Sequence, residues 1–132
     1  MNEKIKVILL GHGSSLSYAQ KNFEKLKNLI AENYSLNDID FAFMTEGKEA
    51  LNKKIYSNLT KNTKKIIVVP VFLSHGVHTK EDIPKMLELN SNNWKNINHQ
   101  GRTIKLIYTE PLGIDLRIAE IVMDRIQNAI NL

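Results

Sequence analysis

The sequence predicts a small α/β fold: a doubly wound, parallel sheet of four strands flanked by helices. Four short apolar runs, rich in β-branched residues, alternate with segments whose apolar residues recur at helical spacing. The links between them are short, which favours parallel strands joined by right-handed crossovers. The chain has 132 residues, 42% of them hydrophobic. This length fits one hydrophobic core, so we expect a single domain over residues 1–132.

The four predicted strands are apolar runs typical of strands covered on both faces. The strongest is KKIIVVPVF, in which Pro70 lies near the end, where a missing amide donor matters least. The predicted strands are Lys4–Leu10, Asp38–Met44, Lys64–Phe72 and Thr103–Tyr108.

The predicted helices carry apolar stripes with polar residues opposite. Thr79 is the expected N-cap of the third helix, with Asp82 as its capping-box partner. The last helix is apolar over much of its circumference, which suggests burial on more than one side, including against a partner subunit. The predicted helices are Ser17–Tyr34, Lys48–Leu59, Thr79–Asn90 and Asp115–Leu132, and the polar segment Ser91–Gly101 is expected to be irregular.

The composition excludes several classes of site and partner. There is no cysteine, which rules out disulfides, thiolate zinc sites and cysteine nucleophiles. The net charge of +4 fits an anionic ligand, but no basic run with interleaved aromatics is present, so we expect no nucleic acid partner. No apolar window approaches the ~18 residues of a membrane span. The start, MNEKIKVILLGHG, has no cleavage-site pattern, so we expect no membrane partner and a cytoplasmic protein.

Three of the four histidines follow predicted strands. His12 follows the first strand, and His75 and His78 follow the third. Parallel strands end at one edge of a sheet, where ligands of open α/β sheets bind. Imidazoles gathered there, with no thiol nearby, suit cobalt, nickel or zinc. The alternative is structural: His12 caps a helix, and the other two, separated by Gly76, face different ways.

The segment GHGSS is the second feature of this edge. Its glycines allow positive φ and close approach of a ligand to the backbone, and a following helix N-terminus favours an anion. It lacks the spacing of a nucleotide-binding loop and of a nucleophile elbow, so Ser14 and Ser15 are not expected to be nucleophiles. A phosphatase with His12 as nucleophile is disfavoured, because no arginine lies beside this segment to clamp a phosphate.

Three segments together resemble a known family. VILLGHGSS, IIVVPVFLSHGVHTKEDIP and IYTEPLGIDLRI are similar to segments of the short, archaeal-type sirohydrochlorin chelatases that insert cobalt or nickel. The resemblance covers essentially the whole chain. It implies a chelatase-like α/β fold, a homodimer of short chains, and sirohydrochlorin and a divalent metal ion as partners. It implies no permanently bound cofactor, because Co²⁺ or Ni²⁺ is the substrate metal.

The resemblance also implies roles for individual residues. The metal-holding histidines map onto His12 and His78, and His12 is also the implied proton acceptor. The loop Leu73–His78 corresponds to the part of the family that lines the tetrapyrrole, comprising Leu73, Ser74, His75, Gly76, Val77 and His78. The segment FMTEGKEAL departs from the Met-Glu and Glu-Pro pattern of relatives, and Lys48 becomes the candidate there to meet a substrate carboxylate.

The implied activity is metal insertion into sirohydrochlorin, for cobalamin or for the nickel tetrapyrrole cofactor of methanogenesis. The sequence does not choose between cobalt and nickel, because imidazole binds both. A carrier of metal or tetrapyrrole, using the same histidines without turnover, is the alternative function.

Overall fold

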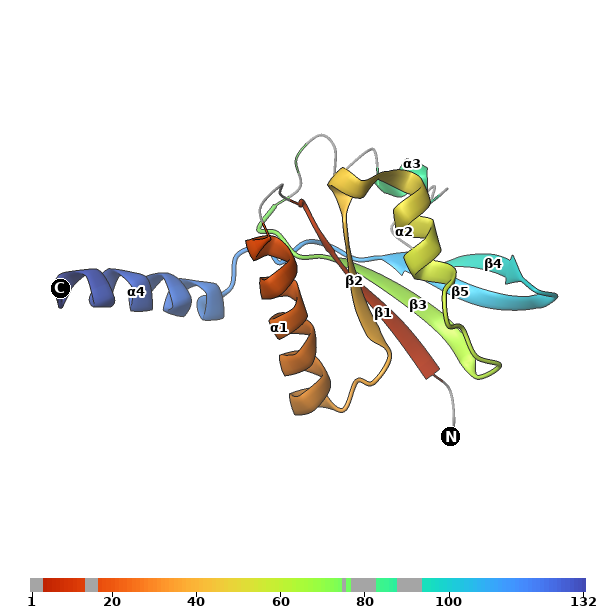
Figure 1. Cartoon of the computed structure of the whole chain (residues 1–132), viewed down its shortest axis with the longest axis horizontal. Coiled ribbons are helices and arrows are strands. Elements are labelled where there is room, and N and C mark those ends of the chain that lie inside the picture. Colours follow the sequence, from red (N-terminus) through yellow and green to blue (C-terminus); the bar gives the residue numbers. More distant parts are fainter. Residues whose placement is uncertain (1–3, 14–16, 75, 77–82, 88–93) are drawn as a thin grey trace.

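A five-stranded sheet of order β2-β1-β3-β5-β4 organises the chain (Figure 1). The computed structural model describes residues 4–13, 17–74, 76, 83–87 and 94–132. β1, β2, β3 and β5 are parallel, and β4 is antiparallel to β5. The strands are β1 (Lys4–Gly11), β2 (Ile39–Phe43), β3 (Thr63–Pro70), β4 (Lys95–His99) and β5 (Arg102–Tyr108). The α/β class and all four predicted parallel strands are confirmed.

The fifth strand corrects the prediction of four strands and of an irregular segment over 91–101. β4 runs from Lys95 paired with Leu106 to His99 paired with Arg102. Gln100 and Gly101 join the two strands, both at positive φ, as two-residue hairpin turns require. Because Ile97 is the one apolar residue of KNINH, the alternation of an edge strand was not visible in the sequence.

Helices cover both faces of the sheet, as the doubly wound prediction requires (Figure 1). They are α1 (Tyr18–Tyr34), the 3-10 turn η1 (Met44–Glu46), α2 (Gly47–Tyr56), α3 (Ile83–Met86) and α4 (Leu116–Ile130). α2 ends three residues before the predicted Leu59, because Ser57 is extended and Asn58 has positive φ. The predicted cap Thr79, its partner Asp82 and the end of that helix at 88–90 lie outside the described residues.

Two apolar clusters form the core, one on each face of the sheet. Alternate residues of β1 serve the two faces: Ile8 and Leu10 belong to the α2 and α3 side, and Val7 and Leu9 to the α1 side. The first cluster contains Ile8, Leu10, Ala42, Leu51, Ile55, Ile66, Val68, Ile83, Leu87, Ile104, Leu106 and Tyr108. The second contains Val7, Leu9 and Phe41, with partly buried residues of α1 packed on them.

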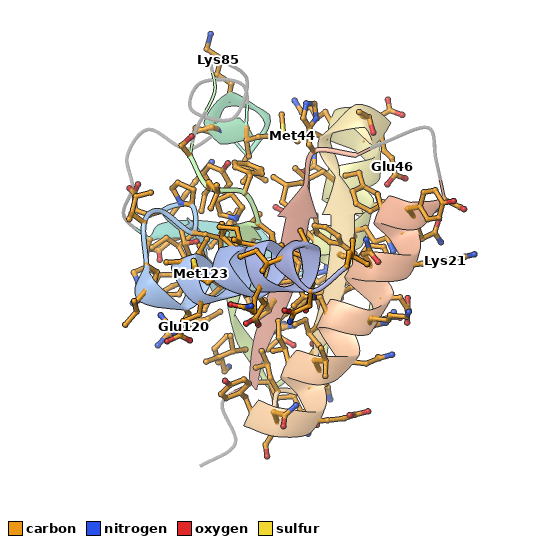
Figure 2. All side chains as sticks on the ribbon, turned by 90° about the vertical axis from the view of Figure 1, so that its left-hand side faces the viewer. Lys21, Met44, Glu46, Lys85, Glu120 and Met123 are labelled. Carbon is orange, nitrogen blue, oxygen red and sulfur yellow. The ribbon has the colours of Figure 1, made fainter. Side chains whose placement is uncertain are left out.

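The last helix departs from this arrangement. α4 extends away from the sheet (Figure 1) and lies at the front of Figure 2, where Glu120 and Met123 are labelled. None of its residues is buried, and all but Ile118 are exposed. The prediction that this helix is buried on more than one side is therefore wrong for a single chain. Among the described residues, no helix is long and apolar enough to cross a membrane.

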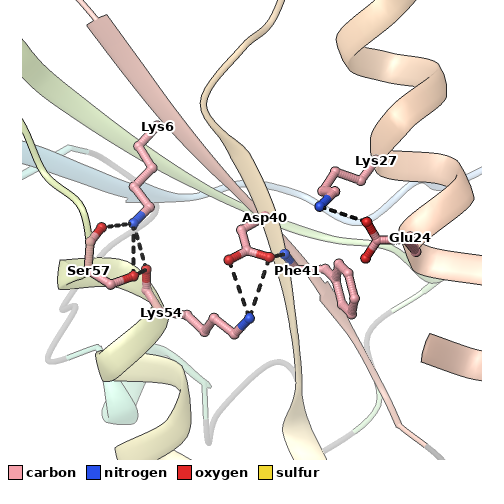
Figure 3. A network of polar contacts seen from close by, with 7 residues as sticks. All are labelled: Lys6, Glu24, Lys27, Asp40, Phe41, Lys54 and Ser57. Atoms are coloured by element: carbon pink, nitrogen blue, oxygen red, sulfur yellow. Dashed lines mark hydrogen bonds and ion pairs between the residues drawn. The ribbon is translucent and has the colours of Figure 1, made fainter. Parts of the chain in front are cut away.

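A buried lysine connects β1 to the end of α2 (Figure 3). Lys6 is 2% exposed, and its Nζ donates to Lys54 O at 2.7 Å and to Ser57 O. The last carbonyls of a helix have no partner within it, and a cation there is favourable. Burial lowers the pKa of Lys6, while Asp38 and Asp40 oppose that shift. This contact links the end of α2 to β1.

Candidate active site

The strand order locates the ligand-binding edge. From β1 the sheet extends to β2 on one side and to β3 and β5 on the other, so the topology reverses between β1 and β3. Open α/β sheets bind ligands beyond the carboxyl ends of the strands at such a point. His12 follows β1 directly, and the segment from Val71 follows β3. The fold therefore places His12 and the predicted substrate loop on either side of the reversal.

The turn that carries His12 is held by close packing around its two glycines. A Cβ on Gly11 would lie 2.6 Å from Cζ of Phe23 on α1, and a Cβ on Gly13 would lie 2.1 Å from Oγ1 of Thr45. Gly13 has φ +101, and Thr45 N donates to His12 O at 3.3 Å. The backbone of His12 is thus fixed between α1 and the end of β2, while its side chain remains exposed.

These contacts qualify the expectation for GHGSS. Gly13 uses the positive φ that a glycine allows, whereas Gly11 completes β1 without it. Beside Gly13, the side chain of Thr45 closely approaches the backbone. The glycines are therefore explained by packing that positions His12. Ser14 and Ser15 lie outside the described residues.

Hydrogen bonds join the segment after β3, which leads into the predicted substrate loop, to neighbouring segments. Val71 N donates to Leu10 O at 2.9 Å, which connects the loop to β1. Leu112 N donates to Phe72 O at 3.0 Å, and Gly113 N to Leu73 O at 2.8 Å. We call Thr109–Gly113 the tether, because it joins β5 to α4 and holds this loop. Leu73 and Ser74 are exposed at the edge.

The remaining residues predicted for the loop are mostly outside the described part of the chain. Gly76 is described and exposed, whereas His75, Val77 and His78 are not described. Among the described residues, no three His, Asp or Glu side chains are grouped to hold a metal ion. The metal-binding role of His12 and His78 and the substrate-binding role of the loop stay predictions.

Lys48 lies on the α2 side of this edge. It is exposed in the first turn of α2 and lines a hollow of about 210 Å³. The other lining residues are Asn52, Tyr56, Leu87, Lys95, Ile97 and Leu106. Two lysines in one hollow favour an anion, which agrees with the carboxylate partner predicted for Lys48. Lys95 was not anticipated, because the strand that carries it was not predicted.

Tyr108 is the last residue of β5. It is 6% exposed, and burial, reinforced by Glu110, raises the pKa of its phenol. A phenol is neutral near pH 7 even at its ordinary pKa, and burial extends that neutral range to higher pH.

A larger cavity, of about 500 Å³, lies at the opposite, amino edge of the sheet. It is lined by Lys4, Ile5, Ser35, Leu36, Asn37, Asp38, Asn58 and Thr60. It is remote from the carboxyl ends of the strands and from His12. The volume of a cavity therefore does not identify the candidate site, whereas the strand order of the sheet does.

Sequence reasoning did not anticipate the contacts that two elements of the site make, Thr45 and the tether. The Pro111 and Gly113 of TEPLG indicated a turn, and Gly113 has φ +69. The sequence near the tether does not indicate which carbonyls it binds, because those carbonyls belong to a segment about 40 residues earlier in the chain.

Comparisons with known proteins identify the family of this chain. The family model described as CbiX matches residues 6–129. A sirohydrochlorin cobaltochelatase of Methanopyrus kandleri is 37% identical, covering 96% of this chain and 97% of the relative. One of Methanosarcina barkeri is 35% identical, covering 98% and 100%. One of Saccharolobus solfataricus is 31% identical, covering 95% of each.

A solved structure shows the same fold. The chain described as a CbiX protein of Marinobacter aquaeolei VT8 superposes with a TM-score of 0.67 at 23% identity, covering 96% of this chain and 98% of that one. The resemblance inferred from three sequence segments is confirmed over nearly the whole length, and this chain belongs to the CbiX family.

Proposed function

We propose that this chain is a sirohydrochlorin cobaltochelatase, a metal-chelating lyase that inserts Co²⁺ into sirohydrochlorin. The observation that carries the proposal is the position of His12 beside the loop after β3, at the reversal of the sheet. Its support is membership of the CbiX family and relatives of that name matched over nearly their full length.

The chemistry requires a base and a metal ligand at one place. The ring must lose two pyrrole N–H protons, and the metal ion must exchange water for pyrrole nitrogens. A neutral imidazole serves both needs near pH 7. We assign His12 as the proton acceptor, and His12 with His78 as ligands that present the metal to the ring. Two protein ligands leave coordination positions open, so the metal can be handed over.

The ring itself carries carboxylates that need cationic partners. We propose that Lys48 binds one of them by a charge-assisted hydrogen bond, which an exposed ammonium beside the site can supply. Lys95, in the same hollow, is a second candidate. The loop Leu73–His78 would line the ring, since its first residues are exposed at the edge and anchored by the tether.

Two finer features belong to the same proposal. Imidazole ligands accept Ni²⁺ as well as Co²⁺, so we propose insertion of either metal, for cobalamin or for the nickel tetrapyrrole of methanogenesis. We also propose a cytoplasmic homodimer, consistent with the wide apolar surface of α4.

The test is metal insertion by purified protein, followed by the change in the absorption spectrum of sirohydrochlorin with Co²⁺ or Ni²⁺. His12→Ala and His78→Ala should each lower the rate by about 10²–10⁴, the usual contribution of a positioned acid–base group. The matched control is His99→Ala. His99 stacks on Tyr56, with ring centroids 5.4 Å apart, at the end of β4 that pairs with the start of β5. Near wild-type rates in both site variants would refute the assignment.

The same assay separates an enzyme from a carrier. A catalyst at substoichiometric concentration converts all of the sirohydrochlorin, whereas a carrier stops at one equivalent per chain. If conversion of sirohydrochlorin stopped at one equivalent per chain, the protein would be a carrier and the proposed function would be refuted.

A further inference from the structure

The hollow of about 210 Å³ that contains Lys48 lies between α2 and β4, and we call it the trench. One wall is a stripe of α2, where Lys48, Asn52 and Tyr56 recur four residues apart and so share one face of the helix. The other wall is the start of β4, where Lys95 and Ile97 are two residues apart and so point to the same face of the sheet. The trench therefore exists only because the fold brings a helix beside a strand that follows it by about 40 residues.

The floor of the trench is apolar. Leu106 of β5 and Leu87, which directly follows α3, complete its lining and are 2% and 5% exposed. Both belong to the core cluster on this side of the sheet, and Ile97 packs against that cluster. Because a leucine side chain offers no hydrogen bond, methylene groups cover this floor more favourably than a bare inorganic anion does.

The two lysines of the trench lie at the edge of the sheet that carries His12. α2 begins directly after η1, at the carboxyl end of β2, and Lys48 is in its first turn. β4 is antiparallel to β5, and Lys95 pairs with Leu106, two residues before the carboxyl end of β5. Thr45, three residues before Lys48, donates its N–H to His12 O at 3.3 Å. Three Cα steps span at most about 11 Å, so the trench opens beside the turn that carries His12.

The lining favours a ligand that is both anionic and partly apolar. Lys48 and Lys95 each carry an ammonium group on a long, flexible stem, and Asn52, one turn further along α2, adds an amide donor. Among the lining residues that the structure describes, no side chain is acidic. A carboxylate held here would accept charge-assisted hydrogen bonds, and carbon atoms attached to it would cover the leucine floor. The volume equals that of about seven water molecules at ~30 Å³ each, which admits a short chain and excludes a tetrapyrrole ring.

We propose that the trench receives one carboxyalkyl arm of the tetrapyrrole and so anchors one side of the ring beside His12. The carboxylate of the arm lies between Lys48 and Lys95, and its methylene groups lie on Leu87 and Leu106. This inference rests on the proposed function, which supplies the ring. It adds to that function the hollow that holds an arm and the apolar contacts that the arm makes there.

Binding of metal-free sirohydrochlorin, followed by the change in its absorption spectrum, tests the trench without turnover. The Kd should rise about 10-fold in Lys48→Met and in Lys95→Met, because each variant loses a hydrogen bond between charged groups. Lys95→Arg keeps the charge and should change the Kd by less than about threefold. The matched control is Lys53→Met, which removes the same charge from an exposed position of α2 outside the stripe and should leave the Kd unchanged. An unchanged Kd in both trench variants would overturn the proposal.

Propionate is the probe for the occupant of the trench. At constant ionic strength it should shift the NMR signals of the methyl groups of Leu87, Ile97 and Leu106 in the parent protein and in Lys53→Met, but not in Lys95→Met. 1-Propanol, which has the same chain length and no charge, should shift them much less. Absence of saturable shifts with propionate would overturn the proposal. Shifts with propionate together with an unchanged Kd for sirohydrochlorin would indicate a site for a free carboxylate, which also overturns it.

The trench and the proposed function can fail separately. A protein that binds sirohydrochlorin through the trench but inserts no metal would refute the function and leave the trench in place. In an active protein, Lys48→Met and Lys95→Met should raise KM while kcat stays within about twofold, because the lost contact is made equally before and during insertion. Metal insertion with KM unchanged in both variants would refute the trench and leave the function in place.

Discussion

Gly13→Ala is the substitution that most directly tests how the turn after β1 positions His12. An alanine there would hold φ +101, which is unfavourable for an L-residue by about 1–2 kcal/mol. Its Cβ would lie 2.1 Å from Thr45 Oγ1 and 3.1 Å from the Cβ atoms of Phe43 and Thr45. Rotation of Thr45 can move Oγ1, but the two Cβ contacts remain, and overpacking of this kind costs about 1–3 kcal/mol.

The free energy of unfolding should therefore fall by roughly 2–5 kcal/mol, a large part of the ~5–15 kcal/mol of an ordinary domain. The assay is urea denaturation followed by circular dichroism. Gly101→Ala is the matched control, because Gly101 also has positive φ (+80) but nothing within 4 Å of a built Cβ. Gly101→Ala should lower the free energy of unfolding only by the conformational cost of positive φ, about 1–2 kcal/mol. Equal losses in the two variants would refute the steric argument.

A double variant separates the steric cost of Gly13→Ala from its conformational cost. Gly13→Ala with Thr45→Ala removes the contact to Oγ1 and should recover part of the steric loss, whereas Thr45→Ala alone should change stability little. Metal insertion by the Gly13→Ala protein, measured where it remains folded, should be reduced because the backbone of His12 is bonded to Thr45 N. A double variant no more stable than Gly13→Ala would show that Thr45 is not the obstacle.

Two further predictions concern the scaffold. Lys6→Met should lower the free energy of unfolding by about 1–3 kcal/mol, because Lys54 O and Ser57 O lose their buried donor. The control is Lys54→Met, which should lower it less because the side chain of Lys54 is 42% exposed. Burial lowers the pKa of Lys6 from 10.5, so just below that pH the unfolded chain binds more protons than the folded one. The stability of the wild type relative to Lys6→Met should thus rise as pH increases toward 10.5, and a fall would contradict the direction of the shift. Asp115→Ala should reduce helix content by far-UV circular dichroism, because it removes the cap of α4 and its ion pair with Arg117 at 2.7 Å; Glu120→Ala, inside the helix, should not.

The candidate site was recognisable from the sequence only in part. The histidines and glycines after two apolar runs indicated a ligand-binding edge, because parallel strands must end together. The packing that holds His12 was not recognisable, since Thr45 lies beyond a full helix and strand from Gly13 and becomes its neighbour only when β1 pairs with β2. The same is true of the tether, whose hydrogen bonds reach a loop after another strand.

The sequence by itself determined the parallel α/β architecture, because buried strands and amphipathic helices are local patterns of apolar residues that are readable without their partners. It also determined that a metal ion, if held, must be held without thiolates. Only the tertiary structure decided the antiparallel strand β4, whose pairing comes from a turn at positive φ and not from an apolar alternation. Only the tertiary structure showed that α4 leaves its own sheet, because the direction of a helix depends on the contacts at its beginning, and an apolar stripe does not specify which chain covers it.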